Sequence, residues 1–248
     1  ISKGFNVHIV LPEKGKLDDF LIKKNIKIEY NELGVLRKKY LNPLGLINRL
    51  VTNIKAIKFL SNYIKTHTID LVYTNTSTIL CGGIAAKKYN IPSLFHIHEI
   101  PTGNKLYEFL SGKIINRISS KVLTVSNSVK NHWLKNINKN KIERIYNGIV
   151  FKKTDSLIKL EKDHNDFVIT SVARLIPYKG HIYLIDIANE LVKKSIKFKF
   201  LIVGDTLSSY ASYEKSVKQK VQELGLENQF KFLGFRNDVS SILKQSDL

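Results

Sequence analysis

Residues 167–204 constrain the fold of this chain more than any other part of the sequence. Residues 167–173 are mostly apolar and β-branched, which is typical of a strand buried on both faces. Residues 181–194 carry apolar side chains at helical spacing, and residues 198–203 form a second apolar run that ends on a glycine. The pattern predicts a βαβ unit, in which a helix joins two parallel strands.

A basic loop joins the first strand of this unit to its helix. It carries Arg174 and Lys179, while Pro177 excludes a helix interior and Gly180 allows a tight turn. In an open parallel sheet, ligands lie outside the carboxyl ends of the strands, where helix amino termini favour anions. The fork of donors on arginine and the mobile charge on lysine suit a diphosphate that gains negative charge as it leaves. Two solvated side chains are the alternative, since the chain has 40 lysines and arginines.

Strands and helices alternate along the rest of the chain. Apolar runs predict strands at residues 7–11, 26–30, 69–74, 91–99, 121–126, 142–146 and 230–233. Apolar spacing predicts helices at residues 17–24, 44–65, 78–89, 105–119, 128–135, 213–224 and 238–245. This alternation indicates parallel sheets with crossover helices. We therefore predict an α/β protein with Rossmann-like domains at residues 1–150 and 167–248, joined by a linker at residues 151–166.

The net charge of +19 is unevenly placed along the chain. Residues 1–150 hold 24 lysines and arginines against 9 acids, whereas residues 151–248 hold 16 against 12. This imbalance predicts that the first half faces an anionic partner. Because no nucleic-acid-binding signature is recognisable, an anionic membrane surface or a phosphorylated lipid is favoured over nucleic acid.

The helix predicted at residues 44–65 has two interpretations. Its apolar side chains, among them Leu46, Leu50 and Ile54, fall on one arc, and residues 34–69 contain seven lysines and arginines but no acid. A helix that packs on the core with a solvated basic rim is one interpretation, and a membrane-surface helix is the other.

The single cysteine, Cys81, excludes an internal disulfide framework and a cysteine-cluster zinc site. Its place beside two glycines in an apolar helix predicts packing, with a reactive thiol as the alternative. No run approaches the ~18 apolar residues of a membrane span, and no signal-peptide pattern is present. These features predict a cytoplasmic protein. Since the chain contains no methionine, opens inside what reads as an element and stops without a closing strand or cap, we expect a fragment truncated at both ends.

Polar residues close the strands predicted at residues 69–74 and 91–99. His96 and His98 share one face because side chains alternate along a strand, whereas Glu99 starts the loop. Asn75 ends the preceding strand. A metal site would need a third ligand that nothing nearby supplies, so no metal is expected. Histidines that pack in the core or cap an element are the ordinary alternative.

Three sequence runs resemble one enzyme family. Residues 172–180 read Val-Ala-Arg-Leu-Ile-Pro-Tyr-Lys-Gly and resemble the Arg-Leu-x-x-x-Lys-Gly signature of the group 1, or family 4, glycosyltransferases. Residues 125–128 and 145–149 are similar to runs that this family carries in the same order, although read alone they predict a helix cap and a turn. Members are retaining, nucleotide-sugar-dependent enzymes with two Rossmann-like domains, the GT-B fold.

The resemblance implies roles at several strand ends. Arg174 and Lys179 would be catalytic, because they would hold the donor diphosphate and stabilise it as it leaves. His98 would also be catalytic, its neutral ring donating a hydrogen bond to a hydroxyl of the donor sugar or the acceptor. The donor site in the second domain would comprise Arg174, Lys179, Gly204, Asp205 and Gly234. Glu99 and Asn75 would lie on the acceptor side, in the first domain.

The resemblance also implies an activity. The complete enzyme would move a sugar from a nucleoside-diphosphate donor to a lipid-linked or surface-polysaccharide acceptor, with retention, without a metal or other cofactor, at the inner face of the cell membrane. The family's glycine-rich loop and its pair of glutamates spaced by seven residues are missing, so we expect little or no activity from the fragment itself. Donor sugar, base, acceptor, linkage and oligomeric state stay open.

Two other functions remain as alternatives. The first is a nucleotide-sugar epimerase of the same two-domain architecture, which would act on the donor without an acceptor. The second is an inactive basic subunit that binds membranes or polyanions, whose membrane binding would be sensitive to salt.

Overall fold

The computed structural model describes residues 4–15, 17–36, 40, 42–101, 105–149 and 166–248. The chain forms two compact units, residues 1–148 and residues 149–248. Apart from Asp166, the linker predicted at residues 151–166 lies outside the described residues, as do three of the basic residues of the loop before α2 (residues 37–39). The two units are considered one at a time below.

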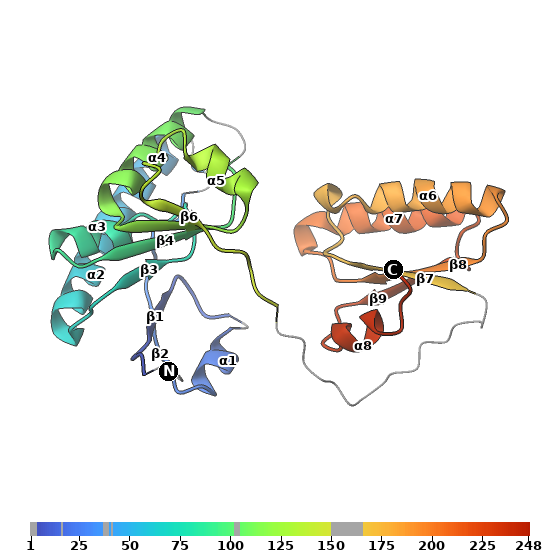
Figure 1. Cartoon of the computed structure of the whole chain (residues 1–248), viewed down its shortest axis with the longest axis horizontal. Coiled ribbons are helices and arrows are strands. Elements are labelled where there is room, and N and C mark those ends of the chain that lie inside the picture. Colours follow the sequence, from blue (N-terminus) through green and yellow to red (C-terminus); the bar gives the residue numbers. More distant parts are fainter. Residues whose placement is uncertain (1–3, 16, 37–39, 41, 102–104, 150–165) are drawn as a thin grey trace. The chain divides into compact units, whose positions relative to one another are not determined.

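The first unit alternates strands and helices (Figure 1). Its strands are β1 (His8–Leu11), β2 (Lys27–Tyr30), β3 (Val72–Thr74), β4 (Ser93–Ile97), β5 (Lys121–Thr124) and β6 (Ile142–Arg144). Its helices are α1 (Asp18–Ile22), α2 (Pro43–His67), α3 (Cys81–Lys88), α4 (Lys105–Ile118) and α5 (Asn127–Trp133). All strand pairs are parallel, in the orders β1-β2 and β3-β4-β5-β6, so the predicted crossover architecture is confirmed.

The core of the first unit lies against β4 and β5. Phe95 and Ile97 of β4 are fully buried and pack with Ile115 of α4 and Trp133 of α5. A Cβ at Gly83 of α3 would lie 2.7 Å from the Phe95 ring, so the glycine lets this helix approach the sheet closely. The neighbouring Cys81 is buried, which raises the pKa of its thiol to about 11. These contacts support the packing interpretation of the cysteine.

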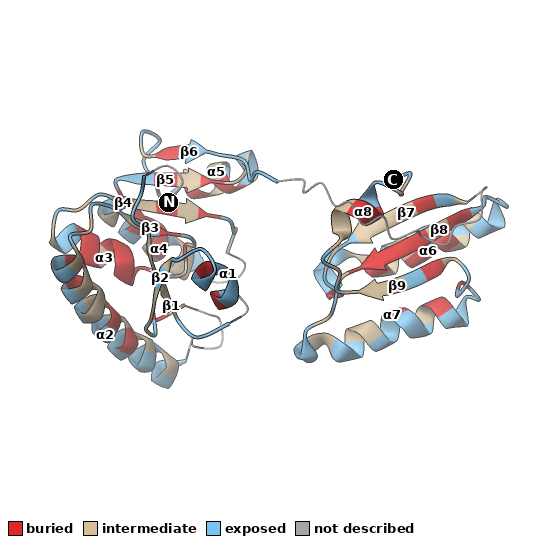
Figure 2. Ribbon diagram, turned by 90° about the horizontal axis from the view of Figure 1, so that it is seen from below, coloured by how far each residue is buried: buried red, intermediate tan, exposed pale blue. Residues whose placement is uncertain are grey.

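Helix α2 differs from the expectation of a core-facing apolar arc. Its buried side chains are small or polar with one exception, and they are Thr52, Ala56, Ser61 and Ile64. The apolar side chains of its amino-terminal half are instead between 45% and 80% exposed; they are Leu44, Leu46, Ile47, Leu50, Val51 and Ile54. Figure 2 shows this helix largely as exposed and intermediate surface. In the carboxyl-terminal half, Ile64 is buried and Ile57 packs against the core, so the core-packed interpretation holds for that half of the helix.

The second unit has the predicted βαβ start and continues with the same alternation. Its elements are β7 (Phe167–Val172), the 3₁₀ turn η2 (Pro177–Lys179), α6 (His181–Lys193), β8 (Phe198–Val203), the 3₁₀ turn η3 (Ser208–Tyr210), α7 (Ala211–Glu223), β9 (Phe230–Gly234) and α8 (Val239–Leu243). The sheet is parallel in the order β7-β8-β9.

Strand β8 lies in the middle of this sheet and is covered on both faces. Phe200 and Ile202 pack with side chains of α6 and α7, whereas Leu201 and Val203 pack with Ile242 of α8. Figure 1 shows α6 and α7 on one face of the sheet and α8 on the other. Burial on both faces explains why β8, apart from Lys199, consists of apolar residues without alternation.

His181, the first residue of α6, should make the second unit sensitive to acid. The side chain is 1% exposed, and among the described residues neither ring nitrogen has a hydrogen-bond partner. Burial lowers the pKa of this imidazole below its ordinary value of 6.5. The unfolded chain therefore binds more protons below pH ~6.5, and acidification favours unfolding.

We expect His181→Leu to remove this sensitivity and to raise stability at neutral pH by about 1 kcal/mol, because an unsatisfied polar ring leaves the core. Thermal unfolding at pH 7.5 and at pH 5.5 tests this. The loss of Tm between the two pH values should be smaller in the variant than in the parent chain. An unchanged loss would contradict the assignment.

Candidate functional site

In the second unit, the segments that follow β7, β8 and β9 are tied to one another. Backbone hydrogen bonds run from Ala173 to Val203 (2.9 Å), from Leu175 to Asp205 (3.1 Å) and from Gly204 to Gly234 (2.8 Å). These bonds bring Arg174, Gly204, Asp205 and Gly234 together at the carboxyl end of one sheet. The structure therefore gathers four of the five predicted donor-site residues through the backbone.

The loops after β7 and β8 lie closest to each other at Gly204. Its φ is +144°, and an added Cβ would clash with the carbonyl oxygen of Ala173 and lie 2.7 Å from that carbonyl carbon. Only glycine fits this backbone conformation and this space. The loop after β7 can lie against the loop after β8 because residue 204 has no side chain.

Arg174 and Lys179 extend from this end of the sheet. Both side chains are exposed, and neither has an ion pair or a side-chain hydrogen bond within the described parts of the chain. Lys179 closes η2, and Gly180 follows with φ +73° to start α6. The two cations are thus held on a short, turn-rich segment and are not neutralised by a neighbouring acid.

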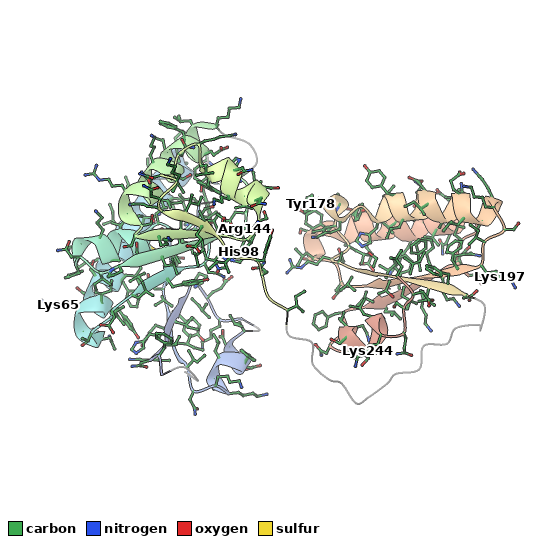
Figure 3. All side chains as sticks on the ribbon, in the orientation of Figure 1. Lys65, His98, Arg144, Tyr178, Lys197 and Lys244 are labelled. Atoms are coloured by element: carbon green, nitrogen blue, oxygen red, sulfur yellow. The ribbon has the colours of Figure 1, made fainter. Side chains whose placement is uncertain are left out.

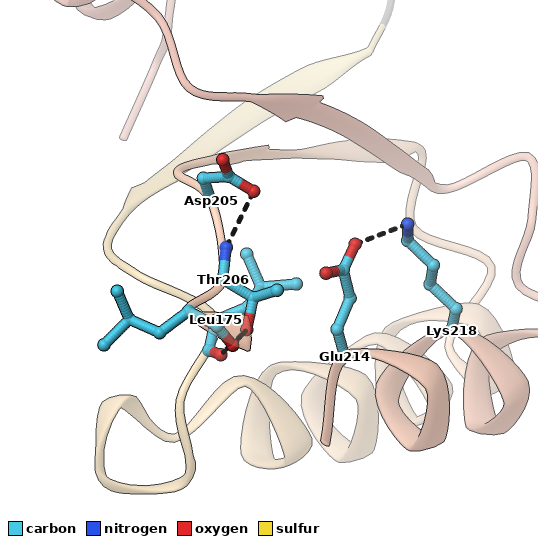
Figure 4. Close-up of polar contacts among 6 residues, drawn as sticks. Leu175, Asp205, Thr206, Glu214 and Lys218 are labelled. Atoms are coloured by element: carbon cyan, nitrogen blue, oxygen red, sulfur yellow. Dashed lines mark hydrogen bonds and ion pairs between the residues drawn. The ribbon is translucent and has the colours of Figure 1, made fainter. Parts of the chain in front are cut away.

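Asp205 and Thr206 fix the loop after β8, as Figure 4 shows. The Thr206 backbone N–H donates to Asp205 Oδ1 (2.8 Å), and the Thr206 hydroxyl donates to the Leu175 carbonyl oxygen (3.0 Å). A cross-loop side-chain bond thereby reinforces the backbone bond from Leu175 to Asp205. Asp205 stabilises its own loop in this structure, which the sequence did not reveal.

In the first unit, polar side chains meet at the carboxyl ends of β3 and β4. The His96 and His98 rings lie with their centroids 4.2 Å apart, which confirms that they share a face. His96 Nδ1 lies 2.5 Å from the Tyr73 hydroxyl, and His98 Nε2 lies 2.9 Å from Asn75 Oδ1. Burial, with His98 nearby, lowers the pKa of His96, so this ring is neutral at physiological pH. Figure 3 shows His98 at the end of β4.

The Asn75 contact determines which nitrogen His98 presents. Because the amide oxygen of Asn75 faces the ring, this contact favours the tautomer in which His98 Nε2 donates to Asn75. In the neutral ring, Nδ1 is then an acceptor. In that tautomer the ring hydrogen points to Asn75, and the hydrogen bond from His98 to a substrate hydroxyl stays a prediction.

Glu99 is surrounded by hydrogen-bond donors. Its Oε1 accepts from the Thr76 hydroxyl, the Ser77 backbone N–H and the Ser77 hydroxyl, each at 2.7 Å, and its Oε2 accepts from the His98 backbone N–H at 3.0 Å. Burial acts to raise the pKa of Glu99, but these hydrogen bonds outweigh it and the pKa falls below its usual value. Glu99 is therefore ionised and bound to its own chain.

Within the described ranges, no three His, Cys, Asp or Glu side chains are close enough together to hold a metal ion. No helix in the same ranges combines the length and the apolar character needed to cross a bilayer.

Two parallel α/β units with polar residues at their strand ends define a Rossmann-like, two-domain class of protein. The family described as Glycosyltransferase Family 4 matches residues 1–152, and that described as Glycosyl transferases group 1 matches residues 152–248. The first match covers more than half of the 248 residues. The chain therefore belongs to the group 1, family 4 glycosyltransferases, as its motifs predicted.

Individual relatives agree with this membership. The Escherichia coli UDP-Gal:alpha-D-GlcNAc-diphosphoundecaprenol alpha-1,3-galactosyltransferase is 25% identical over 100% of this chain and 65% of its own length. An uncharacterised glycosyltransferase of Haemophilus influenzae is 27% identical over 72% of this chain and 48% of its own length. The chain thus spans about half to two thirds of these relatives.

Solved structures of the same fold are known. Anabaena Alr3699/HepE in complex with UDP is 25% identical and covers 100% of this chain and 67% of its own, with a TM-score of 0.77. The Rickettsia africae glycosyltransferase shares the fold with a TM-score of 0.77 at 23% identity, covering 99% of this chain and 64% of its own. These matches confirm the predicted GT-B type of architecture.

Sequence reasoning missed the partners of the predicted residues in the first unit. Tyr73 hydrogen-bonds to His96, and the hydroxyls of Thr76 and Ser77 donate to Glu99. Trp133 Nε1 donates to the Glu99 carbonyl oxygen (3.1 Å). The run of Asn75, Thr76, Ser77 and Thr78 after β3 was the available signal, because four hydrogen-bonding side chains in succession exceed what a turn needs.

Proposed function

We propose that the complete protein transfers a sugar from a nucleoside-diphosphate donor to an acceptor, with retention of anomeric configuration. The observation that carries this proposal is the exposed, unpaired pair Arg174 and Lys179 at the carboxyl end of β7. The arginine fork donates to phosphate oxygens, while the lysine adds a point charge. Preorganised positive charge at the place where negative charge develops lowers the barrier to departure of the diphosphate. These two cations supply that charge, so we propose no metal.

Uridine is the proposed base of the donor. Two observations support it, namely the UDP bound in the Anabaena relative and the UDP-Gal in the name of the Escherichia coli enzyme. We propose that the second unit holds the donor, with Gly204, Asp205 and Gly234 beside the two cations. His98 of the first unit contacts the sugar or the acceptor. The acceptor is lipid-linked or a surface polysaccharide, which the diphosphoundecaprenol in the name of that relative supports.

The test is a transfer assay with the complete protein. UDP-sugars are incubated with and without a polyprenyl-diphosphate-linked sugar, in the presence of EDTA, and released UDP and product are measured. The proposal predicts product only when donor and acceptor are both present, with the anomeric configuration of the donor by NMR. Conversion of the donor alone would instead identify an epimerase, and the absence of any conversion with a panel of donors would contradict the proposal.

An anionic membrane surface is the proposed partner of the first unit, at the inner face of the cell membrane. The amino-terminal half of α2 exposes six apolar side chains, and the whole helix carries Arg49, Lys55, Lys58 and Lys65 without any acid. Apolar side chains that enter the headgroup region and basic side chains that meet anionic lipid bind such a surface together.

We expect Leu50→Glu combined with Ile54→Glu to lower vesicle binding at least tenfold. Each exposed side chain would contribute roughly 1.5–3 kcal/mol if buried in lipid, and each new acid would be repelled. Co-sedimentation with vesicles containing phosphatidylglycerol measures this effect. The matched control is Tyr183→Glu with Ile187→Glu, which places two acids at the same spacing on exposed positions of α6. Equal binding by both double variants would contradict the surface assigned to α2.

A further inference from the structure

We propose that Glu99 is a positioning residue, which holds His98 and Asn75 in register and does not itself contact the acceptor. The proposal rests on the proposed function, since it deepens the role of His98 there. It also replaces the acceptor-side role that the sequence predicted for Glu99.

The carboxylate of Glu99 joins two loops. Its Oε1 holds the loop after β3 through Thr76 and Ser77, and its Oε2 holds the backbone N–H of His98 at the end of β4. The carbonyl oxygen of the same residue accepts from Trp133, a fully buried side chain of α5. Residue 99 therefore connects the ends of β3 and β4 to the core.

The position of Asn75 depends on the hydrogen bonds of Glu99. It directly precedes Thr76, so the bonds from Thr76 and Ser77 to Glu99 fix where the Asn75 side chain begins. His98 is fixed in the same way, through its backbone N–H. The Asn75–His98 hydrogen bond of 2.9 Å joins the two residues that Glu99 holds on either side. Loss of the carboxylate would release both ends of that bond.

The orientation of the His98 ring follows from the same contacts. With Nε2–H donating to Asn75, the neutral ring offers Nδ1 as its hydrogen-bond acceptor. A ring nitrogen that accepts a hydrogen bond can bind the O–H of a sugar hydroxyl. The other tautomer would instead offer an N–H donor at this position. Glu99 thus affects how a sugar hydroxyl is bound, because it fixes the tautomer and position of His98. The hydrogen-bond partner of a metal-binding histidine orients that ring in the same way.

The carboxylate has little capacity left for a substrate. Three donors lie 2.7 Å from Oε1, and Oε2 already accepts from His98. Because every one of these bonds requires an acceptor, glutamine cannot replace glutamate without loss. In either orientation, the amide NH₂ of glutamine would face an N–H or O–H donor.

The first experiment is a double-mutant cycle in the complete protein with Glu99→Gln and His98→Ala. We expect Glu99→Gln to lower kcat about tenfold and to leave the KM for acceptor within about twofold. In the His98→Ala background, Glu99→Gln should cause no further loss, because it acts through a ring that is absent. A multiplied loss in the double variant, or a rise in acceptor KM for Glu99→Gln that His98→Ala does not also cause, would overturn the inference.

The second experiment needs no activity and uses this chain. Long-range ¹H–¹⁵N spectra of the histidine rings should show the Nε2–H tautomer for His98. In Glu99→Gln the His98 signals should move to a mixture of tautomers, while those of His181, which is in the other unit, stay in place. Unchanged His98 signals would refute the positioning role even if transfer is observed. If the expected spectral change were seen but no sugar transfer, the proposed transferase function would be wrong, whereas the positioning role of Glu99 would stand.

Thr76→Val is the control that distinguishes a loss of positioning from a folding defect in Glu99→Gln. It keeps the carboxylate and removes one of its donors. The same tautomer change, smaller in extent and at an unchanged Tm, is expected. The absence of any change in this variant, together with a lower Tm in Glu99→Gln, would show that Glu99 only stabilises the fold.

Discussion

Replacing Arg174 with alanine in the complete protein should lower kcat by about 10²- to 10³-fold, the loss expected when one preorganised donor is removed from developing charge. The side chain is exposed and has no partner among the described residues, so no compensating contact is lost and the fold should be unaffected. Initial rates with saturating donor and acceptor measure the effect. Lys179→Ala should act in the same direction.

Lys197→Ala is the matched control for these two changes. It also removes one exposed positive charge from the second unit, but Figure 3 shows Lys197 at the opposite end of that unit from Tyr178, the residue beside Lys179. The account predicts turnover close to that of the parent protein for Lys197→Ala. Equal activity of all three variants would show that Arg174 and Lys179 are ordinary solvated side chains.

The second large effect is expected for stability. Gly204→Ala should destabilise the second unit by about 4 kcal/mol, because alanine is strained at φ +144° and its Cβ would clash with the Ala173 carbonyl. For a unit of this size, the change corresponds to a drop in Tm of roughly 15 °C. Thermal unfolding followed by circular dichroism measures it.

Gly225→Ala separates the two causes of this loss. Gly225 also has a positive φ of +65°, but an added Cβ there would meet nothing within 4 Å. Only the backbone cost of about 1–2 kcal/mol should remain. If Gly204→Ala proved no more costly than Gly225→Ala, the close approach of the loops after β7 and β8 would be wrong.

The order and type of the helices and strands could be predicted because apolar periodicity is strong throughout. Strand β8, for example, was predicted at its observed bounds, since five of its six residues are apolar and the glycine after Val203 marks its end. Residues 125–128 predicted a helix cap, and in the structure Ser126 caps α5, because its hydroxyl accepts from the Val129 N–H (3.2 Å). The 3₁₀ turns η2 and η3 of the second unit were missed because they are too short to have a period.

Which face of a helix is buried, and which side chains contact one another, was harder to predict than where each helix or strand lies in the sequence. The buried face of α2 carries Thr52, Ala56 and Ser61, and apolar periodicity gives such small or polar side chains no weight. The contacts of Glu99 were missed for a related reason. The contacts with Thr76 and Ser77 join residues 23 and 22 positions apart, and only the pairing of β3 with β4 brings these residues together. Motif similarity identified the residues of the candidate site but gave none of their partners.

The most direct test of the central claim is a calorimetric titration of this chain with UDP and with UMP. The claim is that Arg174 and Lys179 hold the diphosphate of the donor, so the account predicts that UDP binds at least tenfold more tightly than UMP. It also predicts that Arg174→Ala abolishes this difference while Lys197→Ala preserves it. Equal affinity for UDP and UMP in the parent chain, or a preference that survives Arg174→Ala, would contradict the account.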